Sequence, residues 1–471
     1  MNFKQGLKSV GYVFLSNFIS FVISALITFL VPKKLGVDSY GYFQLYLFYS
    51  NYTGFLHFGW ADGIFLRYGG EYYDKLNKRI FGGQIRLYCL VELIFGVVVI
   101  IYACQFVTPQ ERRQVVILTG ISIFLSLSRT LLLYILQCTN RIKEYSIMTM
   151  TEKVVYVLAV AIALLAGATT FFPIGCADLV GKASALGFGL YQCRTLLLEK
   201  PVSLFRSLQE AKENISVGCK LMFATLASML IIGFVRISIE NQWDVATFGK
   251  VSLTMSVSNL LMVFIRAVAL VMFPMLRRTD ESKLSGIYSK MRTCLMIPLL
   301  GMLVFYYPAK VILSAWLPQY ADSLIYMALL FPMCVFESKM SMLIETYMKT
   351  LRKEKWLLIV NLTTVGLSVA CTGVTVYWLH SLDLAVVSIV ALLAFRCVLA
   401  ETLLSHAIEI NVKKDIVCEL ALTVIFISAS WFIGGLAGLA VYLVAYVVYL
   451  FIKRKSMVEM ISMIKTKMIR S

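Results

Sequence analysis

Five basic side chains lie deep inside long apolar stretches of this sequence: Arg129, Lys182, Arg266, Lys339 and Arg396. An ionised side chain at mid-bilayer is costly, so such residues usually face a water-filled cavity or pair with an opposite charge. Arginine holds phosphate through paired hydrogen bonds, so a cavity lined in this way would suit an anionic group. These residues therefore predict either a cationic binding cavity or buried ion pairs.

Five further basic residues near the ends of apolar stretches have a simpler interpretation. A long side chain close to the end of a membrane helix reaches the headgroups while its stem stays in the apolar layer. This interpretation applies to Lys153, Lys220, Arg236, Lys250 and Lys310. We assign them no binding role from the sequence.

Two carboxylates are best placed for coupling transport to an ion. Unpaired carboxylates inside a membrane relay protons or bind Na⁺. Asp178 and Glu337 fall within apolar stretches and are the candidates for H⁺ or Na⁺ coupling. Asp178 precedes Lys182 by four residues, so the two share a helix face. A structural ion pair explains that pair as well as transport chemistry does.

The sequence contains no complete motif of a soluble enzyme. The stretch from Gly175 to Lys182 has one residue too many for a phosphate loop, and Ala183 stands where Ser or Thr is required. The 11 cysteines are scattered singly and there are 3 histidines, which predicts neither a metal site nor another cofactor site. The net charge of +18 resides mainly in short loops, so we expect no nucleic-acid partner.

The elements that position these residues are membrane-spanning helices. Hydrophobic residues make up 59% of the chain and charged residues 15%, against about 45–50% and about 25% in soluble proteins. A helix needs about 20 apolar residues to cross the hydrocarbon core. The sequence predicts an all-α integral membrane protein with about fourteen spans, at 9–31, 40–60, 86–104, 115–137, 147–167, 171–192, 217–238, 250–275, 291–314, 323–347, 356–378, 383–405, 416–433 and 437–453.

The loop charges give this chain an orientation. One set of loops holds only Lys33, Lys34, Arg112 and Arg113, whereas the other set and both termini hold most of the remaining Lys and Arg. Cytoplasmic loops carry the excess of positive charge. Both termini are therefore predicted to be cytoplasmic, which requires an even number of spans.

A short pattern hints at an internal repeat. Residues 37–43 follow the first span and residues 243–251 follow the seventh, and both segments place an Asp before an aromatic residue and a Gly. An offset of six spans gives parallel copies, a plan of transporters that bind substrate between the repeats. We predict a six-helix lobe over 1–205, a second over 206–410, and two added helices with a basic tail over 411–471.

The N-terminal 70 residues or so resemble a known family. A first helix that ends in Pro32-Lys33-Lys34-Leu35-Gly36, a second that opens with Tyr40-Gly41-Tyr42-Phe43, and the segment 59–64 followed by Arg67-Tyr68 carry the resemblance. They are similar to the polysaccharide-transporter (O-antigen flippase-like) branch of the multidrug/oligosaccharidyl-lipid/polysaccharide (MOP) exporter superfamily.

The resemblance implies a V-shaped, MATE-like pair of lobes that works by alternating access in the bacterial cytoplasmic (inner) membrane. It implies a flippase for undecaprenyl-pyrophosphate-linked oligosaccharide units, serving the biosynthesis of surface polysaccharide such as O-antigen, capsule or exopolysaccharide. Membrane lipids, the polysaccharide polymerase and the chain-length machinery are the implied partners. Asp62 and Arg67 lie in the matching motif, so Asp62 joins the coupling candidates and Arg67 the predicted cavity.

Two other functions compete with this interpretation. A cation-coupled multidrug or metabolite antiporter would share the topology, but the first span here contains no carboxylate. A membrane-embedded glycan polymerase or acyltransferase would need a large external loop, whereas the longest, at about 105–114 and 239–249, are short. The sequence thus predicts a transporter and not an enzyme.

Overall fold

The computed structural model describes the backbone of residues 3–277 and 281–470. Side chains are described except at 1–10, 12–14, 261, 263–283, 354 and 455–471. All the elements within these ranges are helices, which confirms the predicted all-α class. The chain forms two compact units: unit 1 is Met1–Leu226 with Val245–Gly249, and unit 2 is Ala227–Asp244 with Lys250–Ser471.

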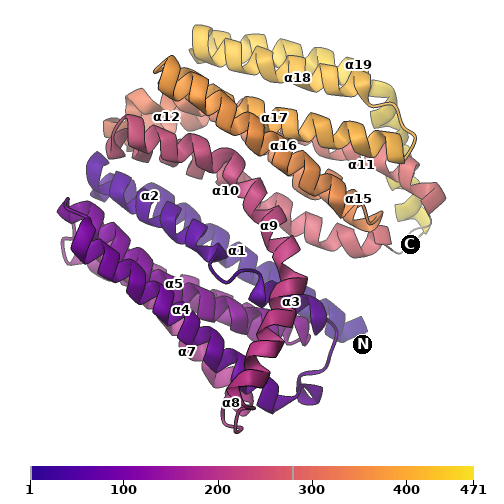
Figure 1. The fold of residues 1–471 in the computed structure, drawn as a ribbon. Helices are drawn as coiled ribbons and strands as arrows, with labels where there is room; N and C mark the ends of the chain where they lie inside the picture. The colour runs from indigo at the N-terminus through magenta and orange to yellow at the C-terminus, as the bar shows by residue number, and fades with distance from the viewer. Residues whose placement is uncertain (1–2, 278–280, 471) are drawn as a thin grey trace. The chain divides into compact units, whose positions relative to one another are not determined.

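Unit 1 is built from long helices joined by short turns (Figure 1). Its helices are α1 (Phe3–Lys34), α2 (Val37–Tyr52), α3 (Trp60–Arg67), α4 (Lys78–Phe106), α5 (Gln110–Cys138), α6 (Ile142–Leu165), α7 (Phe171–Gln192) and α8 (Arg194–Leu197), with the first part of α9 (Leu204–Gln242). Two 3₁₀ turns, η1 (Thr53–Phe55) and η2 (Tyr73–Lys75), join neighbouring helices.

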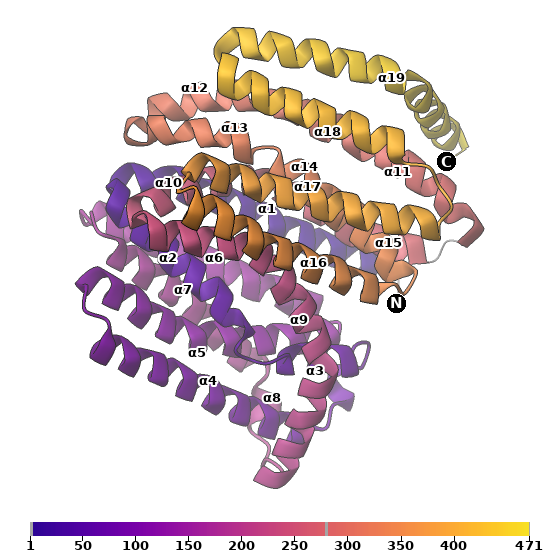
Figure 2. The same ribbon diagram turned by 45° about the horizontal axis from the view of Figure 1, so that its top comes forward.

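Unit 2 contains the rest of α9 and more interrupted helices (Figure 2). They are α10 (Val245–Arg277, whose first turn belongs to unit 1), α11 (Glu281–Met302), η3 (Leu303–Phe305), α12 (Tyr306–Trp316), η4 (Pro318–Ile325), α13 (Tyr326–Leu330), α14 (Met333–Ser338), the π-helix η5 (Lys339–Ile344), α15 (Glu345–Thr350), α16 (Glu354–Thr372), the π-helix η6 (Gly373–Trp378), α17 (Leu382–Ala407), α18 (Lys413–Ser428), the π-helix η7 (Ala429–Ile433) and α19 (Gly435–Arg470).

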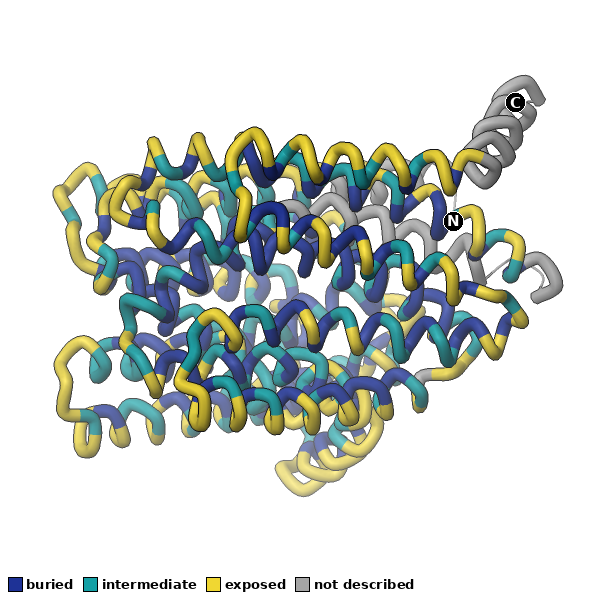
Figure 3. Tube along the Cα trace, turned by 90° about the horizontal axis from the view of Figure 1, so that it is seen from above, coloured by how far each residue is buried: buried dark blue, intermediate teal, exposed yellow. Residues whose placement is uncertain are grey.

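The helices expose apolar side chains, which indicates that hydrocarbon surrounds them. On α4, Leu90, Ile94, Val98 and Ile101 are 48–56% exposed and form a stripe at helical spacing. The tube in Figure 3 shows the same alternation of exposed and buried positions along other helices. A stripe of this kind is stable in hydrocarbon and not in water. The chain is a multi-pass membrane protein.

Helix length and apolarity give fewer spans than the sequence pattern does. Among the described residues, eleven helices are long and apolar enough to cross a membrane, or twelve when the segments Pro318–Leu330 and Met333–Thr350, bent by 44°, form one span. Helix α2 has 16 residues and so is about 24 Å long, short of a core about 30 Å thick. Most side chains of α10 lie outside the described residues. The figure of about fourteen spans therefore stays a prediction.

Helix α9 links the two units along the chain, because its 39 residues contribute to both. The predicted lobe boundary at 205/206 lies at the beginning of this helix, whereas the boundary between the two compact units falls within it. The division into lobes at 1–205 and 206–410, with added helices over 411–471, remains a prediction about functional parts.

Helices α3 and α9 cross at backbone contact within unit 1. A Cβ atom added at Gly63 would lie 1.9 Å from the carbonyl oxygen of Asn214, and one added at Gly218 would lie 2.0 Å from that of Gly59. Gly59 also has a φ of +83°, a conformation that glycine adopts without steric cost. The glycines allow α3 to bring Arg67 against α9.

The two segments of the suspected repeat also meet within unit 1. A Cβ at Gly41 of α2 would lie 2.2 Å from the carbonyl oxygen of Val245, and one at Gly249 would lie 2.6 Å from the Cα of Gly41. The sequence placed these glycines in matching motifs without indicating that they touch. The contact gives both motifs a packing role.

Candidate functional site

The predicted residue Arg67 lies at the end of α3 and is held by the first part of α9. Its guanidinium donates to Asn214 Oδ1 at 2.7 Å and pairs with Glu210 at 3.1 Å and with Glu213 at 2.8 Å. Asn214 in turn donates to Gln84 Oε1 at 3.3 Å. This polar network joins three helices of unit 1, α3, α4 and α9, so Arg67 stabilises their packing.

Asp178 and Lys182 form the ion pair that their spacing suggested. Lys182 Nζ lies 2.7 Å from Asp178 Oδ2 on one face of α7. Tyr46 of α2 donates to Asp178 Oδ2 at 2.6 Å, and Lys182 donates to Ser122 Oγ of α5 at 2.9 Å. Both charged residues are buried. The pair is neutral and satisfied by hydrogen bonds, as a buried pair must be.

Arg129 belongs to a cluster in unit 1 that carries net positive charge. It lies on α5 and pairs with Glu152 of α6 at 2.8 Å, while Lys153 lies 3.7 Å from the same carboxylate. Two cations therefore share one anion. Arg129 Nε is buried and has no hydrogen-bond partner among the described residues. An unpaired buried donor is costly, and an anionic ligand would satisfy it.

Arg396 and Glu337 come together in unit 2. The Arg396 guanidinium, 2% exposed, pairs with Glu337 at 3.2 Å and with Glu345 at 3.2 Å. Its Nε donates to Asn361 Oδ1 at 2.8 Å. Glu337, a predicted coupling carboxylate, is thus paired with a base that was predicted for the cavity.

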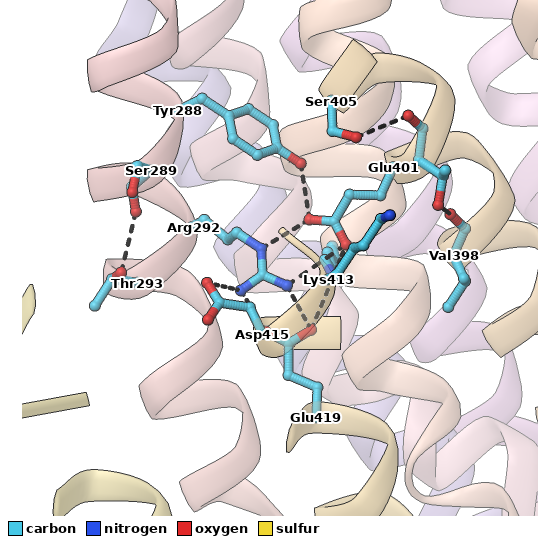
Figure 4. Close-up of polar contacts among 12 residues, drawn as sticks. Tyr288, Ser289, Arg292, Thr293, Val398, Glu401, Ser405, Lys413, Asp415 and Glu419 are labelled. Carbon is cyan, nitrogen blue, oxygen red and sulfur yellow. Dashed lines mark hydrogen bonds and ion pairs between the residues drawn. The ribbon is translucent and has the colours of Figure 1, made fainter. Parts of the chain in front are cut away.

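Lys339 lies in a charge cluster of unit 2, which we call the unit 2 ionic cluster: Arg292, Lys339, Glu401, Asp415, Glu419 and Lys453. Figure 4 shows Arg292 among the carboxylates of Glu401, Asp415 and Glu419. Lys339 Nζ contacts the carboxylates of Glu401 and Glu419. Arg292 pairs with Glu401 at 2.7 Å and with Glu419 at 2.7 Å. Three cations and three anions balance each other in this cluster.

Asp62 and Arg266 are the two remaining residues that the sequence predicts for the site. Asp62 of α3 is buried, and its Oδ2 lies 3.8 Å from Nε2 of His57. Arg266 belongs to α10, but its side chain lies outside the described residues. Their functional roles remain predictions.

The structure pairs Arg67, Arg129, Lys182, Lys339 and Arg396 with carboxylates, and none of these five lines the three cavities described within unit 1. Those three cavities have volumes of about 550, 690 and 660 Å³. None of their lining residues is one of the predicted basic residues. Lys182, Lys339 and Arg396 lie in buried ion pairs, whereas Arg129 is paired with Glu152 but keeps one donor without a partner among the described residues. Their binding roles remain predictions.

Sequence reasoning missed most of the partners. The sequence pattern alone assigned no role to Glu401, Glu419 or Arg292. Their exposures of 0%, 3% and 2% mark them as core residues of unit 2. Fully buried Glu and Arg residues are rare unless they are paired with an opposite charge. The presence of two acids and one base within predicted spans was therefore the signal that could have revealed this cluster. Among the described residues, no group of three His, Cys, Asp or Glu is arranged to hold a metal ion.

Comparison with protein-family models and with curated proteins found no match. Solved structures do match. The chain is similar to "Lipid II flippase MurJ, inward closed conformation", with a TM-score of 0.65 and 10% identity over 94% of this chain and 99% of that one.

Two structures of MATE proteins also match. An inward-facing MATE family transporter of the MOP superfamily has a TM-score of 0.59 and 13% identity over 81% of this chain and 92% of that one. A MATE protein in complex with MaD5 has a TM-score of 0.57 and 12% identity over 85% and 96%. This chain has the all-α membrane fold that MurJ and the MATE transporters share.

Proposed function

We propose that this chain is a transporter of the MOP superfamily that flips a lipid-linked oligosaccharide across the bacterial cytoplasmic membrane by alternating access. The observation that carries the proposal is the extent of the fold match. The MurJ likeness covers 94% of this chain and 99% of the flippase, whereas the two MATE structures cover 81% and 85% of this chain. The fold of the flippase therefore covers a larger share of this chain than the folds of the two MATE proteins do.

The charge distribution of unit 1 supports an anionic substrate. The cluster of Arg129, Glu152 and Lys153 has one positive charge in excess, and Arg129 Nε has no hydrogen-bond partner within the described part of the chain. A pyrophosphate oxygen is a strong acceptor for such a donor. A cationic drug would meet net repulsion there, which disfavours the multidrug antiporter.

A deletion strain tests the proposal. We expect it to accumulate lipid-linked repeat units on the cytoplasmic side and to lose surface polysaccharide. Plasmid-borne Arg129→Gln should restore export at about a tenth of the wild-type rate or less, because a hydrogen bond to a charged group contributes about 1.5–3 kcal/mol. Lys143→Gln, which removes an exposed charge from α6, the helix that carries Glu152, should restore it fully.

The alternative predicts a different phenotype. Normal surface polysaccharide combined with new sensitivity to cationic dyes would overturn the flippase and favour the antiporter. If Arg129→Gln and Lys143→Gln both insert normally and export equally well, the Arg129 cluster does not bind the substrate.

A further inference from the structure

A polar cavity of about 690 Å³ lies at one end of unit 1, among three connections between helices. Residues 72–74 contribute from the α3–α4 connection, Thr139 and Arg141 from the α5–α6 connection, and Tyr191 and Arg194 from the junction of α7 and α8. These connections belong to the basic set of loops that the sequence assigns to the cytoplasmic side. The sequence did not single out any of these residues as a site.

Three cations lie over three tyrosine rings around this cavity. Arg194 lies 4.4 Å from the ring centroid of Tyr191, and Arg141 lies 4.6 Å from that of Tyr73. Lys75 Nζ lies 5.5 Å from the Tyr72 ring. Cation–π contacts of this kind hold the positive groups in place without neutralising them. Asp74 also lines the cavity and Arg141 pairs with Glu144, so the three cations exceed these two carboxylates by one positive charge.

Arg141 fixes one wall of the cavity. It donates to the carbonyl oxygen of Gln192 at 3.1 Å, where α7 ends, and pairs with Glu144 at 3.1 Å. The hydroxyls of Tyr73 and Thr195 are 3.0 Å apart and join two of the connections. Burial raises the pKa of Tyr73, so its phenol stays protonated. The wall is thus preorganised before any ligand arrives.

Arg194 differs from Arg141 in having donors to spare. It is exposed, and among the described residues its guanidinium contacts the Tyr191 ring without a carboxylate or carbonyl acceptor. Tyr72 and Tyr191 are also well exposed, at 68% and 61%. A planar guanidinium fixed over a ring presents a row of N–H groups that matches phosphate oxygens.

We propose that this cavity binds the phosphate group of a lipid headgroup at the membrane surface, with Arg194 as the direct donor. Two sources share this chemistry: the pyrophosphate of a lipid-linked oligosaccharide and the phosphodiester of an anionic phospholipid. The first source rests on the proposed function and makes the cavity a docking site for substrate before transport. The second makes it a lipid contact that anchors unit 1.

Lipid retention on the purified protein tests the inference. Full-length protein in zwitterionic nanodiscs is supplemented with undecaprenyl pyrophosphate or with phosphatidylglycerol, and bound lipid is counted by native mass spectrometry. We expect Arg194→Gln to weaken binding about tenfold, as loss of a charged hydrogen bond does. Lys200→Gln removes an exposed charge six residues away, outside the cavity lining, and should bind as the wild type does.

The two lipids separate the sources, and both outcomes support the site. If Arg194→Gln loses binding of undecaprenyl pyrophosphate only, the cavity docks the substrate. If the variant loses binding of phosphatidylglycerol, the cavity is a phospholipid contact. Equal binding by Arg194→Gln and the wild type with both lipids would overturn the inference. Because the readout is binding, a protein that binds lipid here but does not flip oligosaccharide would contradict the proposed function alone.

Discussion

At the scale of single residues, the unit 2 ionic cluster shows how charges become tolerable inside an apolar helix bundle. Glu401 is fully buried and accepts from Arg292 Nε at 2.7 Å, from Tyr288 at 2.9 Å and from Lys339. Lys339 also lies where α14 gives way to the π-helix η5, a local irregularity that often marks functional positions. The cluster satisfies these charges internally, which leaves them less free to bind a ligand.

Neutralising Glu401 should therefore destabilise the protein strongly. The variant Glu401→Gln leaves Arg292 and Lys339 buried with one carboxylate fewer, and breaking such a pair costs about 3–5 kcal/mol. We expect a clear fall in the midpoint of thermal unfolding in detergent. Glu71→Gln, at an exposed position between α3 and α4, serves as the control and should not shift it. Equal midpoints for the two variants would show that the cluster contributes little to stability.

At the scale of elements, glycines decide how closely helices approach. The crossing of α3 and α9 brings Gly59 and Gly63 against Asn214 and Gly218 with no room for a Cβ. Small residues of this kind are typical of helix contacts in membranes, where close backbone approach replaces the hydrophobic drive. The crossing places Arg67 within reach of Glu210 and Asn214.

The variant Gly63→Ala should force α3 away from α9. Overpacking typically costs about 1–3 kcal/mol, and here the obstacle is backbone, which yields less than a flexible side chain. We expect a lower unfolding midpoint and loss of the Arg67 contacts. Gly187→Ala on α7, where an added Cβ meets nothing within 4 Å, is the matched control. An unchanged unfolding midpoint for Gly63→Ala would mean that α3 and α9 leave room for a Cβ atom at this position.

At the scale of the whole molecule, the added helices α18 and α19 pack side by side (Figure 1) and are attached to the rest of unit 2 by polar contacts. Glu419 and Asp415 of α18 pair with Arg292 of α11, and Tyr442 of α19 donates to the carbonyl oxygen of Leu300 at 2.7 Å. These contacts make the C-terminal helices part of unit 2.

The loop charges predict that the chain ends in the cytoplasm after an even number of spans. A green fluorescent protein fused after Ser471 should fluoresce, and alkaline phosphatase at the same position should be inactive, because the phosphatase folds only after export. The reverse pattern would mean an odd number of spans or an inverted orientation. Fusions after Trp243, in a predicted external loop, provide the control with the opposite expected result.

The sequence by itself determined the membrane setting, the helical class and the short list of ionised residues within spans. Those conclusions depend on local pattern: apolar runs of about 20 residues and charges that interrupt them. The Asp178–Lys182 pair was also predictable, because a spacing of four residues puts both on one face of α7.

Only the tertiary structure decided which charge each remaining base meets. Arg396 pairs with Glu337 and Glu345, 59 and 51 residues away, and Lys339 contacts Glu401 and Glu419, 62 and 80 residues away. Such pairs join different helices, and periodicity along one helix says nothing about the helix that packs beside it. The Arg194 cavity has the same origin, since it exists only where three separate connections meet.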